Sequence, residues 1–391
     1  MKLLIISDSY PPDMKSSAFL VQTLVKHLTS LGHQICIITL SRDIDDTFDD
    51  ENQGDVRIIR LKIPSYGNNL IKRALIELSY SRKIISYLKH HHEDEVDGVI
   101  CYSPSIFFGY AIRYIKKRWS VKCYLIVRDL FPDWAVSVGL MKKGLPYFFF
   151  KYFERVMMIS SDFIGVEAKA NIGHCKRIIG NRDVFIEQLP NWYEPEDIKE
   201  SEVPSSIDKN KVNIIYGGVF GYAQDFISFL YDLETIENNR YRLILVGDGV
   251  ERKKIEDFLV RSEMDIVLLK SMPRIEYLGL IQHCDVGLIV INKNIKANNY
   301  PGKSFDYMSF KKPIFAYLNQ DNEFGKMIDD SNFGYYANGD RDSFKELFNQ
   351  MLDDEEERLI KGIKSEQILS EFFSVTNASK KILTMFHNSN N

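Results

Sequence analysis

The sequence predicts an α/β protein of two domains, each built around a doubly wound parallel sheet. Short, continuously apolar segments such as residues 98–102 and 123–127 alternate with longer amphipathic segments of helical periodicity. This alternation is typical of parallel strands that are covered by helices on both faces. Residues 189–206, which hold three prolines, interrupt the pattern, and it then starts again. With 391 residues, the chain is long enough for two hydrophobic cores.

The first domain is expected to span residues 1–189. Its first strand is predicted at residues 3–7, and the helix that follows, residues 16–31, ends at Gly32. Its other strands are predicted at residues 35–40, 56–61, 98–102, 123–127, 163–166 and 184–188. The acidic run at residues 43–51 is interpreted as a solvated loop.

The second domain is expected to span residues 190–374, and the last helix, residues 375–388, is expected to return to the first domain. Its strands are predicted at residues 212–216, 243–246, 266–269, 286–290 and 314–317. Its helices are predicted at residues 224–238, 250–262, 274–283, 303–310, 322–330, 341–352 and 353–369. Ligands of such folds bind at the carboxyl ends of the strands, so the functional residues should follow strands.

Composition and charge exclude several classes of protein. No stretch of about 18 apolar residues is present, so no membrane span is expected, and the N-terminus becomes polar too early for a signal peptide. The five scattered cysteines fit buried thiols in a reducing cytosol. Residues 1–189 hold 26 Lys and Arg against 21 Asp and Glu, whereas residues 190–391 hold 24 against 33. The basic first half suggests an anionic substrate or surface.

The most informative run is residues 300–316, which read YPGKSFDYMSFKKPIFA. A turn at Pro301 and Gly302 leads into a helix that carries Lys303 in its first turn and Asp306 three residues later. Free amides at a helix start, the helix dipole and a lysine together bind anions. A carboxylate one turn further along can accept two hydroxyl groups of a sugar. The run therefore predicts a nucleoside diphosphate site, and an ordinary capped helix is the simpler alternative.

Glycine-rich turns follow two strands of the second domain. Gly218 and Gln224 lie in the run GGVFGYAQ, and Gly247 lies in the run LVGDG. Glycines at strand ends let backbone amides approach a phosphate group closely. We therefore expect both turns to contribute to the binding of the same diphosphate.

A polar loop follows the first strand of the first domain. It reads DSYPPDMKSS, and Asp13, Ser16 and Ser17 offer oxygen atoms around the start of a helix. We expect this loop to bind the acceptor or a donor phosphate. A plain helix cap is the alternative interpretation.

A charged and aromatic run, RDLFPDW, follows the strand at residues 123–127. Arg128 can neutralise a leaving diphosphate, and a carboxylate can orient an acceptor hydroxyl or stabilise an oxocarbenium-like centre. We assign the polar catalytic role to Asp129 first and to Asp133 second. The alternative is that Asp129 caps the following turn.

Six runs, taken in order and with their spacing, resemble the motifs of a known enzyme family. They are YPP, RDLFPDW, LPNW, GGVFGYAQ, VGDG and PGKSFDYM. The chain thereby resembles GT-B glycosyltransferases of the family-4 type, in particular the bacterial L-fucosamine-type amino-sugar transferases of O-antigen and capsule synthesis. The resemblance implies two Rossmann-like domains that face a cleft. It also implies a UDP-linked N-acetylated or deoxy amino sugar as donor, retention of configuration, and no metal or other cofactor.

The resemblance further implies roles for single residues. Ser271 and Met272 would touch the nucleotide base through their backbone. Asn298 stands where the family has the first carboxylate of an acid pair whose second member corresponds to Asp306. Arg128 stands where many relatives have a histidine, so no histidine is assigned a role at that position.

The implied partners are a nucleotide sugar and a glycan acceptor carried on a polyprenyl diphosphate, with no nucleic acid. Residues 113–119 and 141–153 combine aromatic side chains with lysines and arginines, which suits an anionic headgroup layer. We therefore expect a cytoplasmic protein that is peripheral on the inner face of the cytoplasmic membrane. The alternative is that residues 148–150 line the core.

Two other functions share these features. A UDP-sugar 2-epimerase has the same architecture and donor but needs no acceptor, and a non-catalytic glycan- or lipid-binding protein has no turnover. A nicotinamide-dependent oxidoreductase is disfavoured, because no GxGxxG run follows the first strand.

Overall fold

The computed structural model describes residues 1–65, 67, 70–91, 94–137, 140–237, 239–294, 300–338 and 341–388. The chain forms two compact units. The first comprises Met1–Trp192 and the segment from Val375 onward, and the second comprises Tyr193–Ser374. The first unit therefore extends past residue 189, where the sequence placed the boundary, to Trp192.

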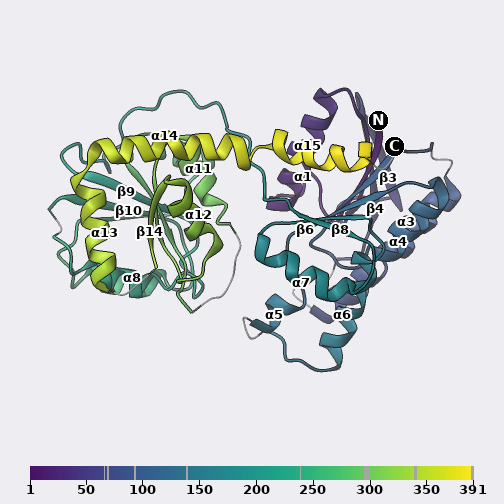
Figure 1. Cartoon of the computed structure of the whole chain (residues 1–391), viewed down its shortest axis with the longest axis horizontal. Coiled ribbons are helices and arrows are strands. Elements are labelled where there is room, and N and C mark those ends of the chain that lie inside the picture. The colour runs from purple at the N-terminus through teal and green to yellow at the C-terminus, as the bar shows by residue number, and fades with distance from the viewer. Residues whose placement is uncertain are drawn as a thin grey trace. The chain divides into compact units, whose positions relative to one another are not determined.

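The first unit is built on an eight-stranded sheet with the order β3-β4-β2-β1-β5-β6-β7-β8 (Figure 1). Neighbouring strands pair in parallel, except that β3 pairs with β4 in antiparallel fashion. The strands are β1 (Lys2–Ser7), β2 (Gln34–Ser41), β3 (Phe48–Gln53), β4 (Val56–Lys62), β5 (Gly98–Tyr102), β6 (Cys123–Val127), β7 (Phe163–Val166) and β8 (Phe185–Gln188). The helices are α1 (Ser16–Ser30), α2 (Leu70–Leu78), α3 (Tyr80–His90), α4 (Gly109–Trp119), α5 (Asp133–Ser137), α6 (Leu145–Met158), α7 (Lys169–Ile179) and α15 (Val375–Asn388).

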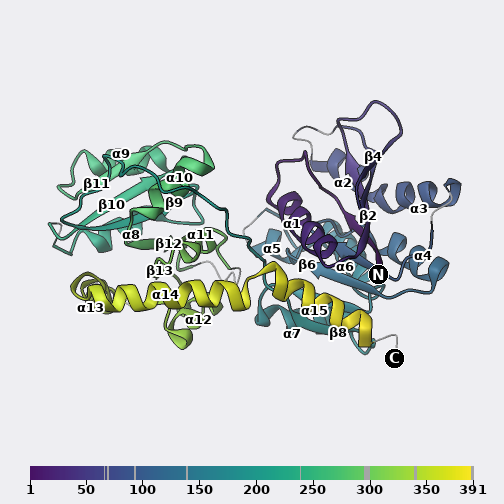
Figure 2. The same cartoon turned by 90° about the horizontal axis from the view of Figure 1, so that it is seen from above.

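Helices cover both faces of this sheet because its strands are apolar on both sides (Figures 1 and 2). In β1, Leu3 and Ile5 face a core that includes residues of α1 and α15. The alternate residues Leu4 and Ile6 face the opposite core, against α3, α4 and α6. Because β4, β2, β1, β5, β6, β7 and β8 are parallel, their carboxyl ends lie along one edge of this packed sheet.

The acidic run at residues 43–51, predicted to be a loop, overlaps the first four residues of strand β3. Its acidic side chains pair with arginines of β4, since Arg57 contacts Asp50 at 2.6 Å and Arg60 contacts Glu51 at 2.8 Å. These cross-strand ion pairs allow a charged segment to form the antiparallel edge of the sheet.

The second unit is built on a six-stranded parallel sheet with the order β11-β10-β9-β12-β13-β14. The strands are β9 (Val212–Gly217), β10 (Tyr241–Val246), β11 (Ile266–Leu269), β12 (Val286–Val290), β13 (Ile314–Tyr317) and β14 (Gly334–Ala337). The helices are α8 (Phe226–Leu233), α9 (Arg252–Leu259), α10 (Arg274–Gln282), α11 (Lys303–Ser309), α12 (Glu323–Ser331), α13 (Arg341–Asp353) and α14 (Glu355–Phe372). Two hydrophobic clusters fill the two faces of this sheet.

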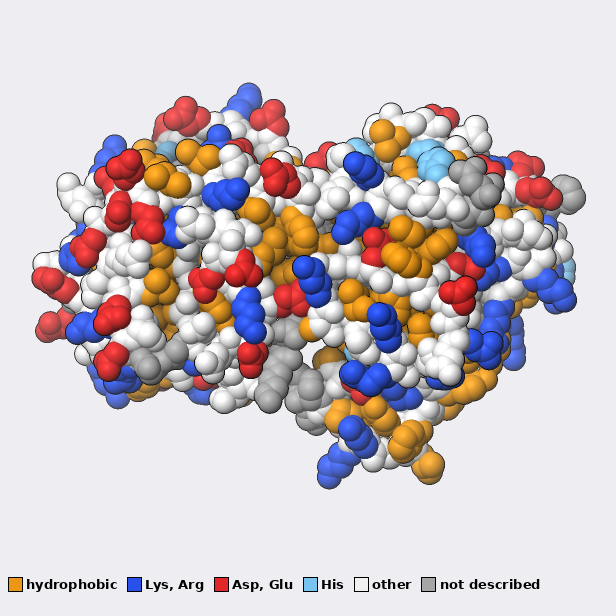
Figure 3. Space-filling model, viewed as in Figure 1, with side chains coloured by type: hydrophobic (Ala, Val, Ile, Leu, Met, Phe, Trp, Pro, Cys, Tyr) orange, Lys and Arg blue, Asp and Glu red, His pale blue; other side chains and the backbone are white. Residues whose placement is uncertain are grey.

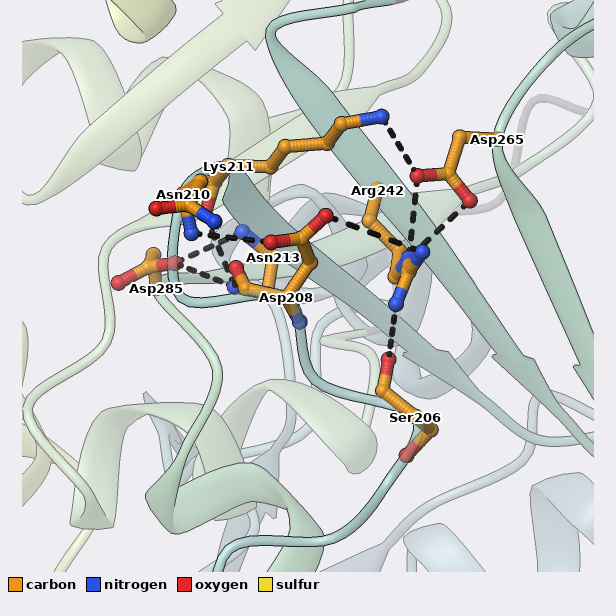
Figure 4. Close-up of polar contacts among 8 residues, drawn as sticks. All are labelled: Ser206, Asp208, Asn210, Lys211, Asn213, Arg242, Asp265 and Asp285. Atoms are coloured by element: carbon orange, nitrogen blue, oxygen red, sulfur yellow. Dashed lines mark hydrogen bonds and ion pairs between the residues drawn. The ribbon is translucent and has the colours of Figure 1, made fainter.

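A network of paired charges closes the amino end of the second sheet (Figure 4). Asp265 accepts hydrogen bonds from Lys211 at 2.8 Å and from Arg242 at 3.0 Å. Asn213 donates to the Asp208 carbonyl at 2.9 Å, and its backbone N–H donates to Asp285 at 2.7 Å. This network fixes the chain segment that enters β9.

No helix among the described residues combines the length and the hydrophobicity needed to span a bilayer.

Candidate active site

Lys303 lies at the carboxyl end of the second sheet, where no described residue gives it an acidic partner. Its Nζ lies 3.7 Å from the centroid of the Tyr216 ring, near the end of β9. Burial alone lowers the pKa of Lys303 to about 7, and no acidic side chain of the described residues opposes this shift. A buried ammonium of this kind is stabilised by an anion that comes from outside the protein.

The glycine turns pack against each other as well as beside Lys303. A Cβ on Gly218, whose φ is 142°, would lie 2.8 Å from the Lys303 Nζ. A Cβ on Gly247, whose φ is 152°, would lie only 1.8 Å from the Gly218 carbonyl oxygen. Glycine is thus required at both positions by backbone conformation and close contact.

The backbone amides of these turns are largely occupied. The Gly218 N–H donates to the Val246 carbonyl at 2.9 Å, and the Phe220 N–H donates to the Asp248 carbonyl at 2.9 Å. The expectation that the glycines bring free amides to a phosphate therefore does not apply to these two amides. These two hydrogen bonds instead link the two turns to each other beside the Lys303 ammonium.

The start of α11 also differs from the expectation of free amides. The Ser304 N–H donates to the Pro301 carbonyl at 2.9 Å, and the Phe305 N–H donates to the Gly302 carbonyl at 3.2 Å. A Cβ on Gly302 would meet nothing within 4 Å, so close packing does not explain this glycine. Anion binding at this position therefore stays a prediction that depends on the Lys303 cation more than on these two amides.

Asp306 is buried and bonded within the protein. Its carboxylate accepts hydrogen bonds from the Tyr193 hydroxyl at 2.9 Å and from Arg274 at 2.8 Å, and Arg274 also contacts Glu196. Tyr193 and Arg274 have no signature in the sequence beyond the position of Tyr193 directly after the LPNW motif. A carboxylate has further lone pairs, so the binding of sugar hydroxyls by Asp306 stays a prediction.

The other residues that the sequence predicts to bind the donor are Gln224, Ser271, Met272 and Asn298. The Gln224 side chain accepts a hydrogen bond from the Gly221 N–H at 3.2 Å and so supports its own turn. Ser271 is exposed after β11, and Met272 is partly buried against the core. Asn298 lies outside the described residues. The contacts of these four residues with a donor stay predictions.

Arg128 is buried in the first unit at the carboxyl end of β6. Its Nη1 donates to the Leu189 carbonyl at 2.8 Å. Its guanidinium carbon lies 4.9 Å from the Trp192 ring centroid and 5.6 Å from that of Tyr102. Its Nε and Nη2 are buried without a hydrogen-bond partner.

Asp129 and Asp133 lie in different environments. Asp129 is exposed at the end of β6, and desolvation by the surrounding protein raises its pKa against the attraction of Arg128. Burial also acts to raise the pKa of Asp133, but hydrogen bonds from Lys151 and Tyr147, each at 2.7 Å, lower it overall. The paired state of Asp133 supports a structural role, and Asp129 is the better catalytic candidate.

Asp133 belongs to a cluster that the sequence analysis missed. Asp133, Glu154 and His174 place ligand atoms within 4.8 Å of one another, a grouping that could hold a metal ion. The ammonium of Lys151 already contacts both Asp133 and Glu154. A protein cation therefore neutralises this cluster, which joins α5, α6 and α7. No spacing in the sequence indicates it, because its members come from three elements.

The loop after β1 is held by its own side chains. Ser17 and Ser9 share a hydrogen bond of 2.7 Å, and Asp13 forms an ion pair with Lys15 at 2.9 Å. Ser16 is exposed as the first residue of α1, which has no side-chain cap, so the simple capping alternative is wrong. Acceptor or phosphate binding by Asp13, Ser16 and Ser17 stays a prediction.

The aromatic segment 141–153 divides into an exposed part and a packed part. Leu145 and Phe148 are 89% and 64% exposed, and Phe149 and Tyr152 are also exposed. Phe150 lies with its ring centroid 6.2 Å from that of Phe107, against the core. The alternative that residues 148–150 line the core thus holds for Phe150 only.

The cations of the two basic segments also divide. Lys142 and Lys143 are exposed beside the exposed aromatics, and Figure 3 shows basic and hydrophobic side chains together over the segment between α5 and α6. Lys151 belongs to the cluster with Asp133, so it does not add to this surface. In segment 113–119, Lys116 pairs with Asp162 at 2.6 Å, whereas Lys117 is exposed.

Comparison with known proteins agrees with this architecture. No family profile matches the sequence. The probable glycosyltransferase WbjE of Pseudomonas aeruginosa is 24% identical over 229 residues, which are 55% of this chain and 55% of that protein. The match thus spans about half the length of this curated relative.

Solved structures resemble nearly the whole chain. An E. coli trehalose-6-phosphate structure bound with UDP-2-fluoro glucose aligns over 99% of both chains, with a TM-score of 0.72 and 11% identity. WaaG, a glycosyltransferase involved in lipopolysaccharide biosynthesis, aligns over 97% of this chain and 99% of its own, with a TM-score of 0.63 and 13% identity. Anabaena HepE in complex with UDP and glucose aligns over 99% and 100%, with a TM-score of 0.64 and 13% identity. The neighbours are glycosyltransferases of the GT-B type, and the predicted fold class is confirmed.

Proposed function

We propose that this protein is a retaining, metal-independent glycosyltransferase. It transfers a sugar, an N-acetylated or deoxy amino sugar by resemblance, from a UDP donor to a polysaccharide precursor. The observation that carries this proposal is the Lys303 ammonium, which lies over Tyr216 beside two glycine turns and has no acidic partner among the described residues. A diphosphate supplies the missing negative charge.

The two units divide the work in this proposal. The second unit binds the nucleotide, with Lys303 on the diphosphate and the Asp306 network near the sugar of the nucleoside. The leaving UDP gains negative charge as the glycosidic bond breaks, so a cation fixed beside it stabilises the transition state. The first unit presents the acceptor, and Asp129 orients the attacking hydroxyl or stabilises the oxocarbenium-like centre. The resemblance of the six motifs supports retention of configuration.

The acceptor in this proposal is linked to a polyprenyl diphosphate at the inner face of the cytoplasmic membrane. The exposed side chains Leu145, Phe148 and Phe149, with Lys142 and Lys143, support contact with an anionic surface. Aromatic side chains enter the headgroup layer, and each nearby lysine contributes about 1 kcal/mol of attraction. Flotation with anionic liposomes tests this contact. Equal flotation of wild type and of a Lys142→Glu, Lys143→Glu variant would contradict it, and a Lys209→Glu variant, which alters an exposed lysine of the second unit, is the control.

Nucleotide release from a panel of UDP- and GDP-sugars tests the proposed activity. We expect release of UDP that depends on an added lipid-linked or glycan acceptor. Conversion of the UDP-sugar without acceptor would identify a 2-epimerase instead, and binding without any turnover would identify a glycan- or lipid-binding protein.

A further inference from the structure

The side chain of Arg128 is only partly satisfied inside the first unit. The residue is 8% exposed, and Nη1 is bonded to the Leu189 carbonyl at 2.8 Å. The other two nitrogens, Nε and Nη2, have no hydrogen-bond partner. These two nitrogens form one edge of the planar guanidinium, and this edge donates two parallel hydrogen bonds to the two oxygens of a single oxyanion.

The surroundings hold the guanidinium in place without neutralising it. The Trp192 and Tyr102 rings lie 4.9 and 5.6 Å from its carbon, and the backbone bond to Leu189 fixes its third nitrogen. Burial raises the pKa of Tyr102. The charge of Arg128 and a side-chain hydrogen-bond contact between Arg128 and Tyr102 both oppose that rise. That contact still leaves Nε and Nη2 unbonded. No carboxylate of the described residues forms an ion pair with Arg128.

A second unpartnered polar atom belongs to residues 189–192, the segment whose Leu189 and Trp192 contact Arg128. Asn191, which lies between Leu189 and Trp192 in the chain, donates to Glu167 at 2.9 Å, but its Oδ1 is buried without a partner. An amide oxygen accepts hydrogen bonds, and a sugar hydroxyl is a suitable donor. Arg128 thus offers two free donors and Asn191 a free acceptor, which are the kinds of group that bond phosphoryl oxygens and hydroxyl groups.

We propose that the Nε–Nη2 edge of Arg128 binds a phosphoryl group of the acceptor, at a subsite separate from the Lys303 site for the donor. This assignment rests on the proposed function, because it takes the acceptor to be a sugar phosphate or diphosphate. It changes the role expected from the sequence, in which Arg128 neutralises the leaving diphosphate of the donor. The first unit alone provides the guanidinium, its supports and the Asn191 oxygen.

Calorimetry on the full chain with UDP present tests the proposal. Saturating UDP occupies the Lys303 site, and inorganic pyrophosphate is then titrated as the probe. We expect wild type to bind one equivalent under these conditions. Arg128→Gln should weaken this binding about 10- to 100-fold, because two charge-assisted hydrogen bonds are lost. Arg82→Gln, which alters an exposed arginine of α3, should bind as wild type does.

Two further variants keep the test decisive. Arg128→Lys retains the charge without the two-pronged edge and should bind more weakly than wild type while the melting temperature stays close. Lys303→Met should weaken UDP binding and keep the pyrophosphate equivalent. Displacement of all pyrophosphate by UDP in wild type would overturn the proposal, as would wild-type affinity in Arg128→Gln.

Two competitors distinguish a lipid-linked from a soluble source of the phosphoryl group. Farnesyl diphosphate represents a lipid-linked acceptor, and N-acetylglucosamine 1-phosphate represents a soluble one. The competitor that displaces pyrophosphate from wild type, but does not bind Arg128→Gln, identifies the source. If Arg128-dependent binding persists while no UDP-sugar is ever turned over, the proposed transferase activity fails. The anion subsite then stands, but its assignment to an acceptor is overturned.

Discussion

At the amino end of the second sheet, Lys211 and Arg242 both contact Asp265 (Figure 4). At the carboxyl end, the Lys303 ammonium lies over Tyr216 with no acidic partner among the described residues. Burial alone would raise the pKa of Asp265, but hydrogen bonds from its two partners lower it. At Lys303 burial acts unopposed and lowers the pKa to about 7. Asp265 is thus neutralised by its neighbours, whereas Lys303 has no acidic partner among the described residues.

The same contrast exists in the first unit. Asp133 is bonded to Lys151 and Tyr147, while Asp129 has no such partners and a raised pKa. Arg128 likewise keeps two nitrogens free. Paired groups of this kind hold elements together, and unpaired groups at strand ends are the ones that chemistry can use. The predictions that follow test this distinction.

The largest effect is expected for turnover when Asp129 is changed. Asp129→Asn should lower the rate of sugar transfer by about two to four orders of magnitude, the range for loss of an acid–base group, with little change in melting temperature. Asp133→Asn should instead lower the melting temperature, because it breaks the cluster with Lys151. A steady-state assay and a thermal melt measure both variants. The reverse pattern would exchange the roles of the two residues.

UDP affinity should separate the two lysines of the second unit. Lys303→Met should weaken UDP binding by about 1.5–3 kcal/mol, or roughly 10- to 150-fold, because a charge-assisted hydrogen bond is lost. Lys211→Met, at the amino end, should leave it unchanged. Titration calorimetry measures both. Equal affinity in Lys303→Met and wild type would remove Lys303 from the donor site.

The sign of the stability change should also differ between the two lysines. Lys303→Met should stabilise the ligand-free protein by about 1–3 kcal/mol at pH 7, because a buried, unpaired cation is removed. Lys211→Met should destabilise it by about 1 kcal/mol, because Asp265 loses a partner. Since the folded-state pKa of Lys303 is lowered to about 7, its destabilising effect is full below pH 7 and disappears as pH rises toward the unfolded value near 10.4. Denaturant titrations at pH 7 and pH 9 measure this trend, and a gain that grows with pH would contradict it.

Removal of divalent metal should have the smallest effect. Turnover should survive excess EDTA, because Lys303 supplies the positive charge at the donor diphosphate that a bound metal would otherwise provide. Loss of activity in EDTA that Mn²⁺ restores would contradict a metal-independent reaction.

Much of the fold could be predicted because buried parallel strands are continuously apolar. Residues 98–102 and 123–127 were predicted as strands and coincide with β5 and β6 at both ends. Strand β3 was missed because its acidic residues become acceptable in a sheet only through arginines of β4. Strand β14 was missed because its sequence, GYYA, contains a glycine and an alanine and no β-branched residue.

The candidate site could be predicted less completely, because its chemistry depends on contacts between distant segments. Lys303 and Arg128 could be named from their motifs. The bond from Arg128 to a carbonyl 61 residues away, which leaves one edge of the guanidinium free, has no signature in the sequence. The contact of Gly247 with the Gly218 carbonyl likewise follows from packing between two turns.

The central claim is that the Lys303 side chain binds the donor diphosphate as its ammonium form. Proton-linked binding of UDP tests this claim most directly. With a pKa of about 7, Lys303 is mostly neutral at pH 8 in the free protein and becomes charged when a diphosphate binds beside it. Calorimetry at pH 8 in two buffers of different ionisation enthalpy measures the protons taken up. We predict uptake of about one proton per UDP by wild type and none by any UDP that Lys303→Met still binds. Binding to wild type without proton uptake, or equal uptake in the variant, would contradict the account.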